Sequence, residues 1–235
     1  MDKTQRSSPS SLAEAQRDLT RSRIRRAAME VVARRGFGAT VEEIAQMSGV
    51  SPRTIFRHYA SHDRLIADTV KDMFEACGLP RQLDDLDGWI EGLPRRIDDL
   101  DGWIEAVALT FHTRSASIFG AAFWDISAPH HDASEVLSEV DVCRRDYRLR
   151  GMGYLMNLVW QTAGGVGEPP ADLALAFALN LSVFTTHALM VDFDQTPAQI
   201  GALTADILKL LLWRAVQTQR STEGDGAADA DSGDG

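Results

Sequence analysis

The fold is limited first of all by the spacing of apolar residues, which recur at three and four positions along most of the chain. Ile24, Ala27, Ala28 and Val31 form one such stripe, and no stretch alternates convincingly between apolar and polar residues. A spacing of three and four places side chains on one face of an α-helix, whereas a half-buried strand alternates with period two. The sequence therefore predicts an all-α protein.

Helix start and stop signals divide the N-terminal part of the chain into separate helices. The first helix should end at Gly36-Phe37-Gly38, because glycine often terminates helices. Thr40 and Glu43 then form a T-x-x-E capping box for a second, short helix that ends at Ser48-Gly49. We expect this second helix to be only about two turns long.

A third helix follows after a short turn. Ser51 can cap it, and Pro52 occupies the first turn, where a missing N–H group costs nothing. The helix extends to Tyr59, and Ser61 begins a fourth helix that continues through Phe74. Two short helices joined by a glycine-containing turn have the spacing of a helix-turn-helix.

The third helix has two different faces. Ile55 and Tyr59 are four residues apart and can pack inward. Arg53 with Arg57, and Thr54 with His58, form neighbouring outward rows that can hydrogen-bond, and the start of the helix at Ser51 offers backbone N–H groups. A helix that reads bases in the major groove needs such side chains near its N-terminus.

The charge of the chain is divided unevenly. Residues 1–64 hold 12 Lys/Arg and 7 Asp/Glu, whereas the rest of the chain holds 12 and 27, which gives net charges of +5 and −15. The basic part can approach phosphates while the acidic part is kept away from DNA. Chance asymmetry remains the alternative.

The segment GFGATVEEIAQMSGVSPRTIFRHYASHDRLI resembles the DNA-binding segment of the TetR family of bacterial regulators, and the match covers residues 20–75. It includes the restrictive pattern from Ile44-Ala45 through Gly49-Val50-Ser51 to Tyr59 and Ser61. The resemblance implies an all-helical homodimer with three-helix heads that bind a palindromic operator. It also implies a divergent body that binds a small molecule and moves the heads apart.

The resemblance carries over to individual residues. Thr40 resembles a phosphate contact, and two positions depart from the family pattern: Phe56 replaces a common Tyr and His62 replaces a common Lys, which weakens two phosphate contacts. The full predicted DNA-binding set is Thr40, Ser51, Pro52, Arg53, Thr54, Phe56, Arg57, His58, Tyr59 and His62. Within this set Tyr59, like the neighbouring Ile55, also resembles a core residue.

Four segments are expected. Residues 1–16 and 218–235 are polar or rich in small residues and should be a disordered arm and a disordered acidic tail. Residues 17–64 are the helix-turn-helix DNA-binding domain, and residues 65–217 are the larger helical effector-binding and dimerisation domain. The arm is an inert tail or, with Lys3 and Arg6, a flexible contact to DNA.

Residues 84–91 (DDLDGWIE) recur as residues 98–105, which indicates a tandem duplication. The intervening Pro94 makes one unbroken helix doubtful. An insertion that lengthens a loop or helix start is the simpler interpretation, and an element that gates a ligand is the alternative.

Two apolar helical stretches, residues 171–192 and 198–217, favour a dimer interface that closes a four-helix bundle with a second copy. An intramolecular core is the alternative. The candidate interface residues are Phe177, Leu181, Phe184, Leu203, Ile207, Leu210 and Leu211.

Aromatic residues and histidines in the body are candidates to line an effector pocket. They are Phe111, His112, Phe119, Phe123, Trp124, Trp160, Phe184 and His187. For each residue taken singly, ordinary core or interface packing is the favoured interpretation, because helical aromatic spacing mainly serves packing. Their apolar character favours a hydrophobic or aromatic effector such as a drug-like compound, an acyl chain or a steroid.

The sequence gives little support for an enzyme or a metal-binding protein. The sequence contains no GxSxG, phosphate-binding glycine loop or HExxH, and His112, His130, His131 and His187 are better explained as core or surface residues than as a catalytic group. Cys77 and Cys143 form no metal-ligand or disulfide pattern and are expected to be buried thiols. We therefore expect no catalytic residues, no metal and no cofactor.

Two further expectations complete the interpretation. No apolar run is long enough to span a membrane and no signal peptide is evident, so the sequence places the protein in the cytoplasm. The function expected is a repressor that leaves a palindromic double-stranded operator when an effector binds. An effector-independent dimeric DNA binder, or an activator, is the alternative.

Overall fold

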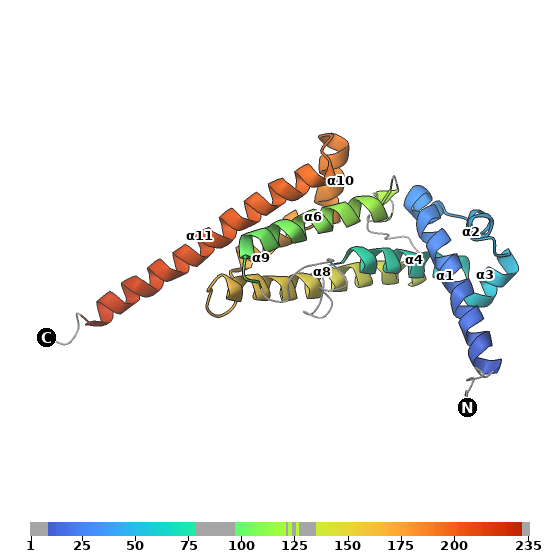
Figure 1. Cartoon of the computed structure of the whole chain (residues 1–235), viewed down its shortest axis with the longest axis horizontal. Coiled ribbons are helices and arrows are strands. Elements are labelled where there is room, and N and C mark those ends of the chain that lie inside the picture. Colours follow the sequence, from blue (N-terminus) through green and yellow to red (C-terminus); the bar gives the residue numbers. More distant parts are fainter. Residues whose placement is uncertain (1–8, 79–96, 121, 124–125, 127–134, 232–235) are drawn as a thin grey trace, which may run out of the picture. The chain divides into compact units, whose positions relative to one another are not determined.

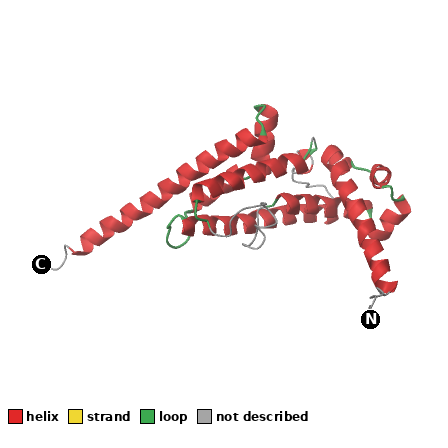
Figure 2. Ribbon diagram, in the orientation of Figure 1, coloured by secondary structure: helices red, strands yellow, loops and turns green. Residues whose placement is uncertain are grey.

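The computed structural model describes residues 9–78, 97–120, 122, 123, 126 and 135–231. Within these ranges the chain forms α-helices and one 3-10 turn, without a strand (Figures 1 and 2). The fold class is therefore all-α, as the apolar spacing predicted.

The helices of the N-terminal region begin and end where the capping residues indicate. They are α1 (Pro9–Arg35), the 3-10 turn η1 (Gly36–Gly38), α2 (Val41–Ser48), α3 (Pro52–His58) and α4 (His62–Cys77). Figure 1 shows α2 and α3 beside α1. These bounds confirm the predicted helix-turn-helix and the glycine-rich stop before it.

The chain divides into two compact units, as far as the described residues extend. The head unit comprises residues 1–75 and 118–144, and the body unit comprises residues 76–117 and 145–235. The boundary between residues 64 and 65 that the sequence favours stays a prediction.

The core of the head unit forms around the predicted stripe of α1. Ile24 and Ala28 are fully buried, and so are Ile44 of α2 and Ile55 of α3. Burial of each isoleucine side chain stabilises the unit by about 2 kcal/mol, which makes apolar contact the main force that fixes the short helices on α1. The short helices α2 and α3 could not persist alone in water.

Residues after Ile118 return to this core. Gly120 lies so close to α1 that an added Cβ would be 2.5 Å from the carbonyl oxygen of Ala33, and the amide of Ala122 donates to the same oxygen at 3.2 Å. Phe119 and Phe123 are buried nearby in an aromatic group with Phe74. This close approach requires glycine at position 120.

The remaining helices are α6 (Leu100–Ile118), α8 (Glu135–Thr162), α9 (Ala171–Asn180), α10 (Val183–Asp192) and α11 (Pro197–Asp231). In the body unit α6 and α11 pack antiparallel, because Asp101 accepts a hydrogen bond from Trp213 and Glu105 pairs with Lys209. Closer to the other end of α6, an added Cβ at Gly201 would be 2.9 Å from the Cα atom of Leu109. The contacts extend along about two turns of α6 and about three turns of α11.

The stretch 171–192 is two helices rather than one. α9 and α10 are bent by 49° at the break between Asn180 and Val183. The Ser182 hydroxyl accepts a hydrogen bond from the amide of Phe184 and so caps a new helix, which a continuous helix would not allow. Apolar composition alone does not reveal this break, because the short polar residues that make it also occur inside helices.

Both terminal helices extend into segments for which the sequence predicted disorder. α1 begins at Pro9, inside residues 1–16, and α11 continues to Asp231, inside residues 218–235. The physical reason is that both segments continue an established helix and no internal proline interrupts them, so propagation requires no new nucleation.

The two copies of the duplication differ in how far the structure describes them. The first copy, residues 84–91, lies outside the described residues, whereas most of the second copy lies in the first turns of α6.

Among the described residues no single helix has the length and apolar composition for a membrane span, although α9 and α10 taken together would meet those two criteria.

Neither cysteine forms a disulfide. Cys77 is buried as expected, its sulfur lies 3.0 Å from the Ser115 hydroxyl, and burial raises the pKa of its thiol to about 11. Cys143 is only half-buried, which differs from the expectation. The protonated state of Cys77 makes it a poor nucleophile.

Candidate DNA-binding site

The capping residues of α2 and α3 build the site locally. Thr40 and Glu43 form the predicted capping box: the Thr40 hydroxyl accepts from the Glu43 amide at 3.2 Å, and Glu43 Oε2 accepts from the Thr40 amide at 3.1 Å. At α3 the Ser51 hydroxyl accepts from the Thr54 amide at 3.3 Å. The chain therefore enters both helices in fixed directions.

The turn between the two helices depends on Gly49. This residue has φ = 66°, a left-handed conformation that costs a residue with a Cβ about 1–2 kcal/mol. Arg23 of α1 donates to the carbonyl oxygen of Ser48 at 2.7 Å and so attaches the turn to the first helix. No sequence pattern indicates this role, because the contact joins residues 25 positions apart in the chain.

The two faces of α3 differ in exposure as predicted. Ile55 is fully buried and Tyr59 is 6% exposed, so both anchor the helix in the core. On the opposite side Arg53 and Arg57 are exposed, with no ion-pair partner among the described residues, while Thr54 is half-buried. An anchored helix with two unpaired guanidinium groups outward can donate hydrogen bonds to guanine edges or phosphates.

The anchor at Tyr59 has a charged neighbour. The Arg21 guanidinium lies 6.0 Å from the centre of the Tyr59 ring. Burial raises the pKa of the Tyr59 hydroxyl, so it stays protonated. The packing of Tyr59 indicates that this residue supports α3. Its contact with DNA stays a prediction.

Thr40 is exposed at the start of α2 and is held by charged neighbours. Arg35 donates to Glu43 Oε1 from Nε at 3.0 Å and from Nη2 at 2.9 Å. The hydrogen bond from the Thr40 backbone, followed by Arg35, lowers the pKa of the Glu43 carboxyl, which remains ionised at neutral pH. Arg35 is a support that the capping pattern alone did not reveal.

His62, the first residue of α4, makes an internal contact. Its Nε2 donates to the carbonyl oxygen of Ala39 at 2.7 Å, and its Nδ1 lies 3.4 Å from Asp63 Oδ1. The ring therefore connects the start of α4 to the residue that precedes Thr40. This role explains how a histidine can occupy a position where the resemblance implies a lysine.

All ten predicted DNA-binding residues lie in the head unit and among the described residues. Exposed ones are Thr40, Ser51, Pro52, Arg53, Phe56 and Arg57; half-buried ones are Thr54, His58 and His62; Tyr59 is buried. Phe56 is 49% exposed and places an apolar ring beside the arginines. The structure brings the set together, and their contacts with DNA stay predictions.

The predicted effector residues fall into different units. Phe119 and Phe123 belong to the aromatic group of the head unit, whereas Phe111, His112, Trp160, Phe184 and His187 belong to the body unit. Trp124 lies outside the described residues. Phe184 and His187 are half-buried and the others are buried. Their common lining of one pocket stays a prediction.

His112 is the most buried polar residue among the described residues of the body unit. It is fully buried on α6, and its ring nitrogens lie 2.8 Å from the Thr186 hydroxyl and 2.9 Å from the Thr204 hydroxyl. Thr186 also donates to the carbonyl oxygen of Ser182, so Nδ1–H donates to Thr186 and Nε2 accepts from Thr204. Burial lowers the pKa of His112 to about 4.

The predicted dimer residues are only partly available to a second copy. Phe177 and Leu181 are buried inside the chain, because α9 packs against α11. Phe184, Ile207 and Leu211 are half-buried. Leu203 and Leu210 are 50% and 70% exposed, and two leucines outside the predicted set, Leu175 and Leu179, are 71% and 68% exposed.

No group of three or more metal-binding side chains occurs within the described part of the chain. The candidate DNA-binding site is built from helix caps, guanidinium groups and an apolar anchor. Its chemistry is that of hydrogen bonding and charge, which suits recognition of a polyanion.

Comparisons with known proteins agree with this geometry. Residues 24–69 match the model of the bacterial regulatory proteins of the tetR family. No curated protein matches the chain.

Solved structures are similar over most of the chain. The transcriptional regulator FadR from Bacillus subtilis, solved in complex with stearoyl-CoA, has 16% identity and a TM-score of 0.56, and the match covers 81% of this chain and 97% of that one. The fatty acid degradation regulator FadR from Bacillus halodurans has 14% identity and a TM-score of 0.57, with the same shares. At these identities the similarity concerns the fold.

The family match covers the helix-turn-helix segment, and the fold similarity extends over the helical body. Residues 24–69 are therefore similar to the bacterial regulatory proteins of the tetR family, and the chain shares its helical fold with solved transcriptional regulators.

Proposed function

We propose that the protein is a repressor whose homodimer binds a palindromic operator and leaves it when a small, largely apolar effector binds the body. The observation that carries the DNA-binding part is the position of Arg53 and Arg57, exposed and unpaired among the described residues on a helix that Ile55 anchors. Thr40, at the start of α2, supplies a phosphate contact that fixes the register. In a bacterial cell this function belongs to the cytoplasm.

The dimer we propose forms through exposed leucines of α9 and α11. Leu175 and Leu179 are one turn apart on α9, and Leu203 and Leu210 are two turns apart on α11. Each pair lies on one face of its helix, and all four side chains are at least half exposed. Covering these faces with those of a second copy would remove apolar surface from water and create a two-fold interface.

The two recognition helices of such a dimer would lie about 34–36 Å apart, or somewhat more, on one face of the operator. Effector binding would change that spacing. A 100-fold change in operator affinity requires about 2.7 kcal/mol of difference between the effector's affinities for the two conformations.

The effector we propose carries a long apolar portion and a hydrogen-bond acceptor. Two observations in the body unit support this class. Large apolar side chains are buried there, and the indole N–H groups of Trp103 and Trp160 are buried without a hydrogen-bond partner among the described residues. An oxygen of a bound molecule could accept from either indole. The Bacillus subtilis regulator with this fold binds stearoyl-CoA, which makes acyl-CoA the first class to test.

The test is a fluorescence-anisotropy titration of the full chain with its upstream intergenic DNA and with a random duplex, at two salt concentrations. We expect selective binding, and Arg53→Ala should weaken specific binding about 5- to 150-fold while it changes non-specific binding less. Arg53→Lys is the matched control, because it keeps the charge and loses the two-pronged hydrogen bond to guanine. Equal losses on both DNAs would refute Arg53 as a base-reading residue.

Stearoyl-CoA is then added to the protein–operator complex. Release of the operator, with no effect on a variant whose Trp160 is replaced by Phe, supports an acyl effector that uses the indole. Selective DNA binding without any response would favour the effector-independent regulator. Activation instead of repression would be recognised by placing the operator upstream of a reporter promoter.

A further inference from the structure

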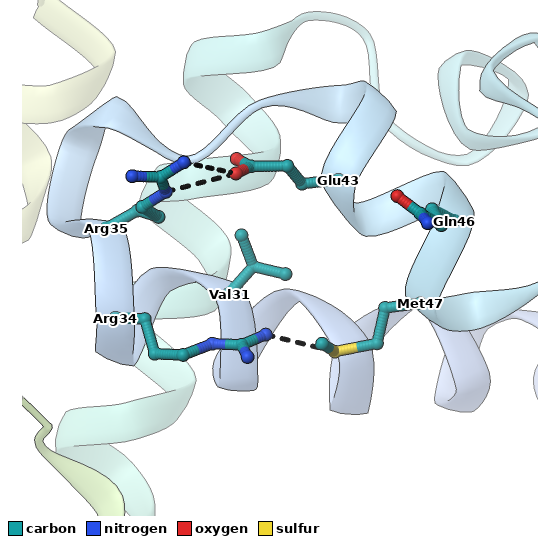
Figure 3. A pocket seen from close by; sticks show the side chains of 6 residues that line it. All are labelled: Val31, Arg34, Arg35, Glu43, Gln46 and Met47. Atoms are coloured by element: carbon teal, nitrogen blue, oxygen red, sulfur yellow. Dashed lines mark hydrogen bonds and ion pairs between the residues drawn. The ribbon is translucent and has the colours of Figure 1, made fainter.

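An open cavity of about 640 Å³ lies in the head unit, between the C-terminal end of α1 and the outer side of α2. Figure 3 shows its lining: Val31, Arg34 and Arg35 from α1, and Glu43, Gln46 and Met47 from α2. Among these, Glu43 and its partner Arg35 also support Thr40 in the DNA-binding site, and the other four residues belong to the cavity alone. The volume lies within the range of about 300–1,000 Å³ that small-molecule sites occupy.

The charges around the cavity are not balanced. Arg35 and Glu43 form an ion pair, so their charges offset each other, and the second oxygen of Glu43 is occupied by Thr40. Arg34 has no carboxylate partner among the described residues. Its Nε donates to the carbonyl oxygen of Glu30 at 3.2 Å, and its Nη2 lies 3.8 Å from the sulfur of Met47. One positive charge therefore faces the cavity without an anion.

Apolar groups lie beside that charge. Val31 is 2% exposed and forms the inner wall, whereas Met47 is 39% exposed across from it (Figure 3). The thioether of methionine is polarizable and adapts to irregular apolar partners. A guanidinium group pairs with a carboxylate through two parallel hydrogen bonds. The cavity thus combines a site for an anion with a site for a hydrocarbon chain.

We propose that this cavity binds a small molecule with a carboxylate on an apolar chain, the carboxylate on Arg34 and the chain over Val31 and Met47. Glu43 connects this site to DNA, because the same carboxylate lines the cavity and holds Thr40. A second anion beside the Arg35–Glu43 pair competes for Arg35, loosens the hold on Thr40 and repels nearby phosphates. The ligand therefore weakens DNA binding directly in the head, independently of the effector proposed for the body.

The test uses the full chain with ¹³C-labelled methionine methyl groups and octanoate as the probe, followed by NMR. Met47→Leu assigns the signal of the cavity, and the signals of Met29 and Met73 report whether the head unit stays folded. We expect the Met47 signal to shift in a saturable manner with octanoate. Acetate lacks the chain and octanol lacks the carboxylate, so each should cause at most a small shift.

Arg34→Gln should weaken octanoate binding at the Met47 signal by about fivefold or more, since a charge-assisted hydrogen bond is lost. Arg26→Gln is the matched control, because Arg26 is an exposed residue of α1 that does not line the cavity and its replacement removes the same charge. An unshifted Met47 signal, equal effects of the three probes, or equal losses in the two variants would overturn the site.

Anisotropy with a random duplex tests the consequence for DNA. Octanoate should lower the affinity of the original chain over the same concentrations that shift the Met47 signal, and should do so much less for Arg34→Gln. An unchanged DNA affinity at a saturated Met47 signal would overturn the connection through Glu43. Stearoyl-CoA release of the operator in the Arg34→Gln variant distinguishes the body effector from this site.

Discussion

Hydrogen bonds between polar groups join residues close together in the sequence in the head unit and residues far apart in the sequence in the body unit. In the head, the caps of α2 and α3 join residues three apart: Thr40 with Glu43, and Ser51 with Thr54. In the body, His112 of α6 bonds to Thr186 and Thr204, which are 74 and 92 residues away. Local caps recur as sequence patterns, whereas the histidine network exists only after three helices have packed together.

This difference predicts how each region responds when a polar contact is removed. A lost cap leaves the affected groups near water, which can replace the contact. Removal of a partner inside the body leaves a buried hydroxyl or imidazole without a hydrogen bond. The free energy of unfolding then falls by the full cost of desolvating that group. The experiments below test this contrast in order of expected size.

Replacement of the buried histidine should have the largest effect. His112→Leu removes two hydrogen bonds and leaves the Thr204 hydroxyl buried without its acceptor, so the free energy of unfolding should fall by about 3 kcal/mol. Urea denaturation followed by tryptophan fluorescence measures this, because all five tryptophans follow residue 75. Thr204→Val removes one hydroxyl with little change in side-chain shape, and it should lower the free energy of unfolding by less. A loss below about 1 kcal/mol in the histidine variant would contradict the contrast.

The same histidine predicts a pH dependence. Its pKa is about 4 in the folded chain and about 6.5 when unfolded, so the unfolded state binds an additional proton between these values. Stability should be fully present above pH 6.5 and should fall by about 1.4 kcal/mol per pH unit as the pH drops towards 4.

Denaturation curves at pH 7.5, 6, 5 and 4.5 for the original chain and His112→Leu isolate this contribution, because other titrating groups are common to both. The difference between the two proteins should narrow as the pH falls. A constant difference would show that His112 binds its proton equally in the folded and unfolded states.

In the head, the turn should be more sensitive than the caps. Gly49→Ala places a Cβ at φ = 66° and 3.0 Å from Arg23 Nη2, and should cost about 1–2 kcal/mol. Gly49→Asn should cost less, since asparagine tolerates this conformation. Thermal unfolding followed by circular dichroism compares the two, and equal losses would assign the cost to crowding against Arg23 rather than to backbone conformation.

The smallest effect should follow from loss of one cap. Thr40→Ala removes the hydroxyl that accepts from the Glu43 amide and should cost about 1 kcal/mol. Hydrogen exchange of the first amides of α2 should then accelerate about fivefold. Thr40→Ser keeps the acceptor and should preserve most of the protection. An effect as large as that of His112→Leu would remove the distinction between local and distant contacts.

The sequence by itself determined the all-α class and the boundaries of the helix-turn-helix. Apolar spacing, the T-x-x-E box, Ser51 with Pro52, and the glycine after Ser48 act over one or two helical turns, so their physical effects are present in the local sequence. The inward positions of Ile55 and Tyr59 and the outward positions of Arg53 and Arg57 follow from the same helical period.

Only the tertiary structure decided which apolar residues face water and which polar residues find partners. Phe177 and Leu175 belong to the same apolar helix, yet packing of α9 on α11 buries the first and leaves the second exposed. The His112 network, the Arg23 contact to Ser48 and the cavity beside Arg34 likewise join segments that are distant in the chain. Such contacts depend on the direction in which each helix crosses its neighbour, and periodicity within one helix does not contain that direction.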